Sequence, residues 1–501
     1  MTQDPRKIPV IVGAGQINDR PADPMQGLDP VGLMVEALKL ADADAGGGWL
    51  SACDSLDVVD QISFRHLNPL PDRICAALSI APAHRHQPRM PMGDSPVRLL
   101  NDAANRIAAG EARVAAVVGA EALRTAAQQA ALSAGNSEAE HNALRKRPRD
   151  YQPSYRDRYG LSAPVDLYPL YENATRAAWG QSLAEGQAES ALIWSLFSQV
   201  AAQNEGAWIR KPHSPADILE VSDRNRPIAF PYTKLMVANS SVNQGAGFLV
   251  TSLAEARART IPESRLIFVG RGAAAHETDE ILERDSFSRS AGMEVSIRNA
   301  LSLNAMTVDD LSCAELYSCF PCVPKMARRI LGWPADRPAT LFGGLTFGGG
   351  PIANYMSHAI VGMVHRLRSD PGNGLLFANG GFATYNHSII VSSAPLAHVE
   401  LPAHYDFQGA ADAMRPPAPQ VDEKYAGPAT LESYTVLYDR AGAVRWGVVV
   451  GRGEKGQRFL ARVPASDAAT IAFLTDGRVE PVGSPGRAER TAEGDTLWHQ
   501  A

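Results

Sequence analysis

Cysteine is scarce in this chain, with five residues among 501, and their number is odd. Scattered thiols of this kind do not make the disulfide framework of a small secreted protein. Long hydrophobic runs are also missing, because no window reaches the roughly 18 uncharged apolar residues that a membrane-spanning helix needs. The N-terminal residues become polar after a few positions, unlike a secretory signal. We therefore predict a soluble, cytoplasmic protein that does not bind membranes.

Positive charge is not concentrated in any block of the sequence. The 48 Lys and Arg residues are outnumbered by 54 Asp and Glu residues, which gives a formal net charge of −6. Binding to nucleic acid needs a footprint of Lys and Arg that neutralises phosphates, so we expect no nucleic-acid partner. The composition, 45% hydrophobic and 20% charged, is that of an ordinary globular protein. The length predicts two to four domains.

Three of the five cysteines, Cys313, Cys319 and Cys322, lie close together, and the last two form a C-x-x-C pair. A redox pair would lie where a strand meets a helix and would need a thiol of lowered pKa. A zinc site would need a second pair or closely spaced histidines, and Cys53 and Cys75 do not supply one. An isolated pair is weak evidence for either function. We predict no metal site, and the stretch needs another explanation.

The segment Val10–Asp19 reads as a buried strand followed by a tight turn. It contains Gly13-x-Gly15 but lacks the third glycine and the acidic residue of a dinucleotide-binding fingerprint. We therefore expect no nucleotide site here and interpret the segment as an edge strand of a core sheet.

Two segments about 250 residues apart show the same pattern. Ser95–Leu123 has apolar residues at helical spacing, a helix end at Gly110 and then an apolar strand. Pro351–Ala383 repeats the apolar helix, follows it with a turn of Pro, Gly and Asn, and ends in a second apolar strand. Each segment is typical of a crossover helix and a buried strand in an α/β sheet. The repeat predicts a duplicated α/β fold with related halves.

These patterns predict five parts of the chain. Residues 1–131 and 233–260 form the N-terminal half, a polar helical insertion occupies 132–232, and residues 261–400 form the C-terminal half. Residues 401–429 are a proline-rich linker. Residues 430–501 show period-two alternation with D-R-A-G and G-E-K-G turns, which predicts a small antiparallel β domain of OB-like type. Its Trp446 and Phe459 alternate with apolar residues as core residues do, which does not favour nucleic-acid stacking.

Five short motifs occur in an order that is known from one enzyme superfamily. They are "GDSPVRLL" at Gly93–Leu100, "NQGAG" at Asn243–Gly247, "ELYSCF" at Glu315–Phe320, "GGLTFGGGP" at Gly343–Pro351 and "FANGG" at Phe377–Gly381. In turn they resemble C-x-S-G, N-D-G-A-A, E-x-H-D-C-F, G-G-L-x-x-x-G-H-P and C-x-G-G of the thiolase superfamily, and especially of the sterol-carrier-protein-type thiolases, which are acetyl-CoA acetyltransferase-like. The resemblance implies a thiolase fold with αβαβα layers and two mixed five-stranded sheets. Cys319 then lies on a catalytic loop, and Cys322 is its incidental neighbour.

The reactive side chains of that superfamily are missing from the matching positions. The nucleophilic cysteine corresponds to Gly93, the histidine of G-H-P to Gly350, and the second cysteine to Ala378. The histidine and aspartate of H-D-C-F correspond to Tyr317 and Ser318. A thiolase needs a thiolate at a helix N-terminus to carry the acyl group. We therefore predict that thiolase activity is absent.

The backbone of the resembled site is retained. The N–H groups of Gly93 and Gly380 are predicted to form an oxyanion hole, since backbone donors do not depend on side chains. The resemblance places further polar groups and Gly350 on the same loops, and it assigns Ser240 to the pantetheine of coenzyme A and Lys234 to a CoA phosphate. We predict acid or base roles for Tyr317, Tyr355 and His387, with Asn354, Asn379 and Tyr385 as polar neighbours.

Three functions remain open. The first is binding of an acyl-CoA with retro-aldol cleavage of a 3-hydroxyacyl-CoA, which needs an oxyanion hole and a tyrosine acid or base but no nucleophile. The second is non-catalytic binding of CoA or acyl-CoA. The third is acyl transfer with an atypical nucleophile, Ser95 or Cys319, although neither has a visible base. In each case the ligand is a coenzyme A thioester and no prosthetic group is expected. The resemblance implies a homodimer, and a monomer if the extra domain blocks dimerisation.

Overall fold

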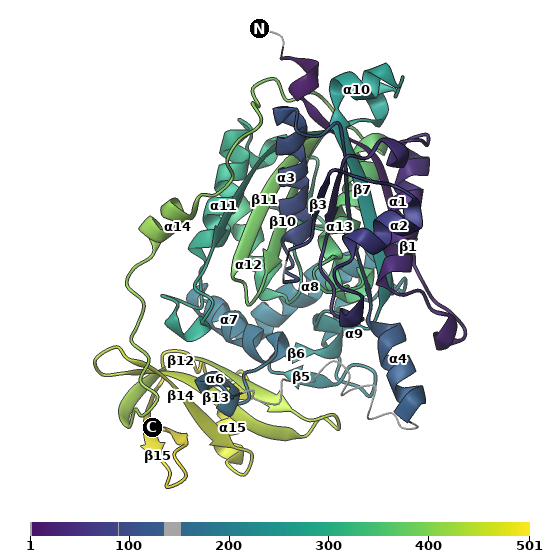
Figure 1. Ribbon diagram of the computed structural model, residues 1–501. Helices are drawn as coiled ribbons and strands as arrows, with labels where there is room; N and C mark the ends of the chain where they lie inside the picture. Colours follow the sequence, from purple (N-terminus) through teal and green to yellow (C-terminus); the bar gives the residue numbers. More distant parts are fainter. Residues whose placement is uncertain (1–2, 89, 135–151) are drawn as a thin grey trace.

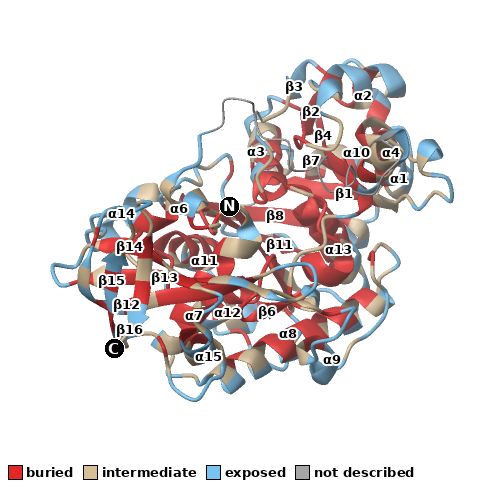
Figure 2. Ribbon diagram, turned by 90° about the horizontal axis from the view of Figure 1, so that it is seen from below, coloured by how far each residue is buried: buried red, intermediate tan, exposed pale blue. Residues whose placement is uncertain are grey.

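The computed structural model describes residues 3–88, 90–134 and 152–501. Residues 1–2 and 89 of the predicted N-terminal half and 135–151 of the predicted insertion lie outside the described residues. An α/β core forms the upper part of the molecule in Figure 1, and a β barrel lies below it. Figure 2 shows buried residues along the strands of both parts.

The two halves of the core carry matching elements. The N-terminal half contains β1 (Pro9–Asn18), α1 (Pro30–Asp44), β2 (Ser55–Val58), α2 (Pro71–Leu78), β3 (His84–His86), α3 (Ser95–Ala109), β4 (Val114–Ala122), β7 (Asn243–Ser252) and α10 (Leu253–Ala258). The C-terminal half contains β8 (Ile267–His276), α11 (Ala291–Leu303), β9 (Cys313–Leu316), α12 (Cys322–Leu331), α13 (Tyr355–Ser369), β10 (Asn373–Gly380) and β11 (Tyr385–Ser392).

The order of strands confirms the predicted duplication. The core sheet runs β3-β2-β4-β7-β1-β8-β11-β10-β9. In the N-terminal half α3 leads into β4, which lies between β2 and β7; in the C-terminal half α13 leads into β10, which lies between β9 and β11. The segments Ser95–Leu123 and Pro351–Ala383 therefore hold equivalent places on the two sides of the β1–β8 junction.

Strand β1 lies in the middle of the sheet, which corrects the edge position expected for Val10–Asp19. It pairs with β7 along its length and with β8 at Val10 and Ile11. Its glycines permit close contact with α1, because a Cβ on Gly13 would lie 2.1 Å from the carbonyl oxygen of Ala41. The glycines therefore serve helix packing in a buried strand.

The C-terminal half contributes four strands where five were expected, and the two halves join in one nine-stranded sheet. The segment that would match β3 follows α12 and contains Pro334 and Pro338, which have no N–H to donate to a ladder. One backbone–backbone hydrogen bond joins it to β9, from the N–H of Leu316 to the carbonyl of Ala339. Arg337 bonds backbone carbonyls on the same side, so β9 ends the sheet beside a loop.

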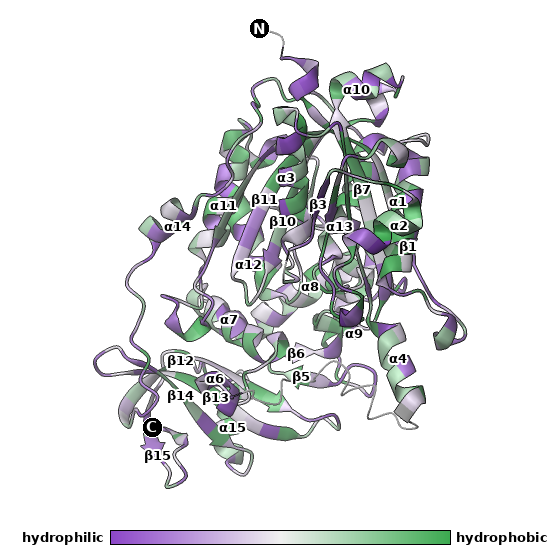
Figure 3. Cartoon of the chain, viewed as in Figure 1, coloured by the Kyte–Doolittle hydropathy of each residue, from purple (hydrophilic) through white to green (hydrophobic). Residues whose placement is uncertain are grey.

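Helices α3 and α13 form the layer between the two halves. They pack against each other, and each contacts strands of both halves. Helix α1 covers the other face of β1, β4 and β7, and α11 covers β8 and β11. Figure 3 shows hydrophobic residues throughout these elements. The predicted helix end at Gly110 is observed, with a φ of 75° that glycine adopts without strain.

The predicted insertion is mainly helical. It contains α6 (Tyr155–Arg158), α7 (Pro164–Ala178), α8 (Leu183–Gln203), α9 (Pro215–Leu219), β5 (Pro227–Ala229) and β6 (Tyr232–Thr233). Helix α4 (Leu123–Ala134) begins in the predicted N-terminal half and ends in the insertion. Two segments of the insertion belong to the barrel as well, because β5 extends the barrel sheet through Ala229 opposite Leu437 and β6 pairs with β5. The insertion therefore joins the core to the C-terminal domain.

The C-terminal domain is a closed five-stranded barrel. Its elements are β12 (Gly427–Tyr438), β13 (Val444–Gly453), β14 (Arg458–Pro464), α15 (Ala468–Thr475), β15 (Pro485–Arg490) and β16 (Thr496–Gln500). The order β13-β14-β16-β15-β12 closes where β12 pairs with β13. The barrel rests on α7, where the Asn173 side chain donates to the carbonyl of Tyr434 at 2.9 Å. The OB-like assignment stays a prediction.

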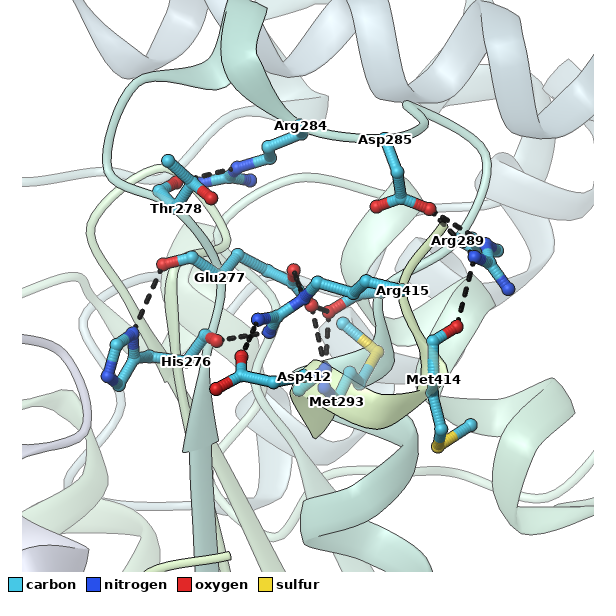
Figure 4. A network of polar contacts seen from close by, with 12 residues as sticks. His276, Glu277, Thr278, Arg284, Asp285, Arg289, Met293, Asp412, Met414 and Arg415 are labelled. Carbon is cyan, nitrogen blue, oxygen red and sulfur yellow. Dashed lines mark hydrogen bonds and ion pairs between the residues drawn. The ribbon is translucent and has the colours of Figure 1, made fainter. Parts of the chain in front are cut away.

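The segment expected to be a linker contains α14 (Gln408–Met414), which packs against α11 and β8. Figure 4 shows how its end is fixed. Arg415 pairs with Glu277 at 2.9 Å. The other carboxylate oxygen of Glu277 accepts the N–H of Gly292, at the start of α11, at 2.7 Å. The chain is therefore attached to the core before it enters the barrel.

Candidate functional site

Gly93 precedes α3 at the position that the sequence assigns to the missing nucleophile. A Cβ built on Gly93 would lie 2.2 Å from the carbonyl oxygen of Asn379 and 2.5 Å from the hydroxyl oxygen of Tyr317. Real Cβ atoms do not come so close to backbone. The place of the thiolase cysteine side chain is therefore filled by the end of β10 and by Tyr317.

Gly380 and Gly93 lie side by side. A Cβ on Gly380 would lie 2.9 Å from the backbone nitrogen of Gly93 and 3.0 Å from the Oδ1 atom of Asp94. The structure thus brings together the two glycines of the predicted oxyanion hole. Gly350 has other neighbours: its N–H donates to the carbonyl of Asn239 at 2.8 Å.

Asp94 is a site residue that the sequence reasoning missed. It occupies the N-cap position of α3 but makes no side-chain capping bond. The residue is buried, and desolvation raises the pKa of its carboxyl to about 6. An acidic residue directly before a helix was the available signal, but it is also the ordinary signature of a cap. Here the carboxyl is left near Gly380 instead.

Tyr317 follows β9 and is 8% exposed. Burial raises the pKa of its hydroxyl well above the ordinary value, and its coupling to the nearby Cys319 and Asp94 groups raises the pKa further. The hydroxyl therefore stays protonated near neutral pH, and it can donate a proton but is a poor base. Its ring meets that of Tyr355 edge-on, with centroids 5.8 Å apart.

The hydroxyl of Tyr355 faces a buried carboxylate and not Gly93. It donates to Oε1 of Glu315 at 2.6 Å, and the N–H of Leu341 donates to Oε2 at 2.7 Å. Burial raises the pKa of Glu315 to about 7, and these hydrogen bonds oppose the rise. Tyr355 is thus coupled to Glu315 and reaches Tyr317 only through the contact of the rings.

The raised pKa of Glu315 gives a testable dependence of stability on pH. The unfolded state loses this proton near the ordinary pKa of 4.5, and the folded state keeps it to about 7. The folded state therefore binds more protons in this window, and its stability falls as the pH rises from 4.5 through 7. At 1.4 kcal/mol per pKa unit, Glu315→Gln should remove about 3 kcal/mol of that fall.

Chemical denaturation of the wild type and of Glu315→Gln between pH 4.5 and 8 measures this difference. Glu36→Gln is the matched control, because the Glu36 side chain is 43% exposed and pairs only with Lys39 at the surface. Parallel pH profiles for wild type and Glu315→Gln would show that Glu315 is charged in the folded state at pH 5.

His387, in β11, contacts α3 beyond its first turn. Its Nε2 atom is 3.4 Å from Oδ1 of Asn101, in the second turn of α3, and its ring packs on Tyr405 with centroids 4.9 Å apart. Burial lowers its pKa to about 3, so the imidazole is neutral at physiological pH. The structure does not bring His387 together with Tyr317.

The two predicted asparagines are buried, and their side-chain amides donate hydrogen bonds to other protein groups. The side chain of Asn354 donates to the carbonyl of Gly119 at 2.6 Å, and that of Asn379 donates to Oδ1 of Asn386 at 2.9 Å. Tyr385, the last polar neighbour, is half-buried and donates to Asp279 at 3.2 Å. These contacts orient loops around the site.

The two predicted CoA-binding residues lie apart. Ser240 is half-buried and follows Asn239, whose carbonyl holds Gly350, so it lies beside the G-G-L loop. Lys234 is exposed at the start of a short 3-10 helix, Lys234–Met236. Ser240 is therefore the nearer of the two to the loops of the site.

The cysteines provide no reactive thiolate. All five are free and buried. Burial raises the pKa of Cys319 to about 12, and it raises that of Cys322 well above the ordinary value. The C-x-x-C pair is therefore neither a disulfide nor a redox pair of lowered pKa. No group of three His, Cys, Asp or Glu side chains in the described residues is arranged to hold a metal ion.

A cavity of about 1010 Å³ lies away from Gly93. Thr340 lines it, and the hydroxyl of Thr340 bonds Glu315 at 3.0 Å, so the buried Glu315 separates this cavity from Tyr317. None of the three predicted acid or base residues lines it. Its walls come from β1, α8, α13 and the loop after α12.

Gly93→Cys should not create a thiolase. The new Cβ must displace the carbonyl of Asn379, so we expect the variant to lose about 1–3 kcal/mol of stability and to show no thiolysis of acetoacetyl-CoA. Gly409→Cys is the matched control, because no atom lies within 4 Å of a Cβ there. Thermal unfolding and a CoA-dependent thiolysis assay measure both effects. Thiolysis by a fully stable Gly93→Cys protein would contradict the packing described for Gly93.

The structure as a whole matches that of a monomeric SCP2-thiolase-like protein type 1 from Mycobacterium smegmatis. The match covers 100% of both chains with 30% sequence identity and a TM-score of 0.83. The chain belongs to the SCP2-thiolase-like protein type 1 family. The model of the thiolase-like protein type 1 additional C-terminal domain matches residues 407–493, from the residue before α14 to the turn between β15 and β16. The predicted recognition and the predicted fold class are thus confirmed.

More distant structures share the fold of this SCP2-thiolase-like protein. The Ltp2-ChsH2(DUF35) aldolase is 18% identical over 78% of this chain and 100% of its own, with a TM-score of 0.59. Human mitochondrial 3-ketoacyl-CoA thiolase in complex with CoA is 13% identical over 79% and 100%, with a TM-score of 0.56. No curated protein sequence matches the chain significantly. Among the described residues, no helix is long and apolar enough to cross a bilayer.

Proposed function

We propose that this SCP2-thiolase-like protein binds the thioester of a 3-hydroxyacyl-CoA and cleaves its C2–C3 bond by a retro-aldol reaction, without an acyl-enzyme. The observation that carries the proposal is the placing of the Tyr317 hydroxyl beside Gly93, where a thiolase would hold its cysteine side chain. A proton donor thus replaces the nucleophile next to two backbone N–H groups. One relative of the same fold is named an aldolase, and another was solved with CoA.

The reaction needs a base, an oxyanion hole and an acid. The carboxylate of Asp94, with a pKa of about 6, takes the proton of the 3-hydroxyl group. The C2–C3 bond breaks, the aldehyde or ketone leaves, and the electron pair forms the enolate of the shortened acyl-CoA. The N–H groups of Gly93 and Gly380 hold the enolate oxygen. Tyr317 gives its proton to C2, and Asp94 then gives Tyr317 the proton that it took from the substrate. The net change is the transfer of one proton from the 3-hydroxyl group to C2, and both side chains return to their starting states.

This scheme needs no prosthetic group, because the thioester itself stabilises the carbanion. We propose that the CoA thioester is the only small-molecule ligand that the reaction requires. Turnover that is unchanged after exhaustive dialysis against a chelator is the expected result, and a loss that an added cofactor restores would contradict it.

Non-catalytic binding of an acyl-CoA is the second candidate, and the enclosure of the site favours it. Tyr317 is 8% exposed and Tyr355 is 1% exposed. A binding protein would use the N–H groups of Gly93 and Gly380 to hold the thioester oxygen, and it would need no general base that acts on the ligand. Acyl transfer through an atypical nucleophile has less support, because Cys319 has a pKa of about 12 and no base contacts Ser95 in the described residues.

Incubation with a panel of 3-hydroxyacyl-CoA thioesters tests the proposal. Mass spectrometry should detect a shortened acyl-CoA and an equal amount of aldehyde or ketone, with no acylated protein. Calorimetric binding without products would support the binding role instead. An acylated peptide containing Cys319 or Ser95 would support acyl transfer and contradict both other functions.

We propose that the protein acts as a monomer in the cytoplasm, although the thiolase resemblance alone implies a homodimer. The relative from Mycobacterium smegmatis that matches over the whole chain is described as monomeric. Analytical ultracentrifugation should give the mass of one chain at micromolar concentration. A measured mass of two chains would contradict the monomer and support the homodimer.

A further inference from the structure

Two arginines lie over the ring of the buried Trp208, and a third arginine lies near the first of them. The guanidinium carbon of Arg20 lies 4.0 Å from the centroid of the Trp208 ring, and that of Arg124 lies 6.0 Å from it. Arg210 follows two residues after Trp208. We call Arg20, Arg124 and Arg210 the arginine cluster. All three are exposed, whereas Trp208 is 8% exposed.

The arginine cluster has no carboxylate partner among the described residues. Toward other described residues, the side chains of the cluster make one hydrogen bond, from Arg20 to the carbonyl of Trp208. The carboxylate of Asp19, next in the chain, accepts the N–H of Leu28 instead. Partial desolvation lowers the pKa of Arg20, and the nearby charges of Arg124 and Arg210 lower it further.

Like charges held together without a counter-ion destabilise a fold unless an anion joins them. This chain has an acidic net charge of −6. Among its other arginines, Arg106 pairs with the carboxylate of Asp57 and Arg458 with that of Glu432. Within the described part of the chain, the arginine cluster is therefore a positive patch that no carboxylate neutralises, on a protein of acidic net charge. Guanidinium groups bind phosphate oxygens through two parallel hydrogen bonds, which makes phosphate the favoured anion.

The backbone connects the arginine cluster to the loops of the candidate site. The N–H of Trp208 donates to the carbonyl of Gly348 at 2.8 Å, within the G-G-L loop that continues to Gly350. The N–H of Arg124 donates to the carbonyl of Val242 at 3.3 Å, two residues beyond Ser240. The cluster thus adjoins both the G-G-L loop and the segment that the resemblance assigns to pantetheine.

We infer that the arginine cluster binds the phosphates of the CoA nucleotide, so that the pantetheine chain runs from there past Ser240 toward Gly93. Coenzyme A carries a 3'-phosphate and a pyrophosphate, which supply enough negative charge for three guanidinium groups. The guanidinium group of Arg20 stacks over the ring of Trp208, and this cation–π contact fixes the position of Arg20. The inference rests on the proposed function, since it names how the same ligand is held.

Titration calorimetry with defined probes tests the inference. Wild-type protein should bind CoA about 10-fold more tightly than 3'-dephospho-CoA, and Arg124→Gln and Arg210→Gln should each weaken CoA binding about 10-fold. Acetyl-pantetheine, which lacks the nucleotide, should bind wild type and variants alike. Arg487→Gln removes an exposed charge on barrel strand β15 and is the matched control, with no expected effect. Raising the salt concentration should weaken wild-type binding more than that of the variants.

The outcomes separate the inference from the proposed function. Tight binding of CoA that neither Arg124→Gln nor Arg210→Gln changes would overturn the inference and leave the proposed function standing. Adenosine 3',5'-bisphosphate is the second probe. If it binds wild type and not Arg124→Gln while acyl-CoA is never cleaved, the inference holds and the lyase proposal fails. Absence of binding by CoA and by the bisphosphate would overturn the inference.

Discussion

Tyr317→Phe is expected to lower the turnover of 3-hydroxyacyl-CoA cleavage by about 100-fold or more, the usual scale for loss of a general acid. The ring would remain in place beside Gly93, but the proton donor to C2 would be gone. Affinity for acyl-CoA should change less than about 3-fold, because the N–H groups of Gly93 and Gly380 are unaffected. Steady-state kinetics together with calorimetry measure the two effects.

Tyr438→Phe is the matched control for Tyr317→Phe. It removes the same hydroxyl group from β12 in the barrel and should leave turnover unchanged. Asp94→Asn should lose activity as well, and the acidic limb of the wild-type pH–rate profile should show the pKa of about 6 that burial gives Asp94. A Tyr317→Phe protein that retains full turnover would remove Tyr317 from the mechanism.

Lys325→Met is expected to destabilise the core by about 3–5 kcal/mol, which is the cost of leaving a buried charge without its partner. The side chains of Lys325 and Glu172 are 0% and 2% exposed and form an ion pair between α12 and α7. Lys325 also donates to the carbonyl of Gly186 at 2.7 Å, and Tyr232 donates to the other oxygen of Glu172 at 2.8 Å. Urea denaturation followed by tryptophan fluorescence measures the loss.

Two variants make this result specific. Lys39→Met removes a surface lysine that is 54% exposed, and it should change stability by less than about 1 kcal/mol. The double variant Glu172→Gln and Lys325→Met removes both charges and should recover part of the loss. If Lys325→Met is no less stable than Lys39→Met, then the charges of this pair are not both present in the folded protein.

The duplication could be predicted from sequence because helix and strand periodicity depends on neighbours along the chain. The helix of Ser95–Leu123 and that of Pro351–Ala383 each show an apolar face, and the strands that follow are continuously apolar, as buried strands must be. The fifth strand expected in the C-terminal half was predicted wrongly for the opposite reason. Pro334 and Pro338 prevent a ladder there, but a resemblance of motifs carries over the number of strands without examining each segment.

The site was predicted only in part. The positions of Gly93 and Gly380 follow from motifs that fix the backbone, and the structure places these two residues together. Tyr355 begins α13 and His387 lies in β11, and their hydroxyl and imidazole groups face Glu315 and Asn101. The direction of a side chain depends on which partner lies across the fold. Asp94 was missed because an acidic residue before a helix is usually a cap.

The sequence by itself determined that the thiolase nucleophile is absent, since no fold can place a thiol on Gly93. It also determined the two related halves and the extra β domain, because these depend on local patterns. Only the tertiary structure decided what fills the vacated position, which is Tyr317, and which charges meet without a carboxylate partner among the described residues, as those of Arg20, Arg124 and Arg210 do. These residues are more than 80 positions apart in the chain. Burial and charge depend on distance through space, and folding alone sets that distance.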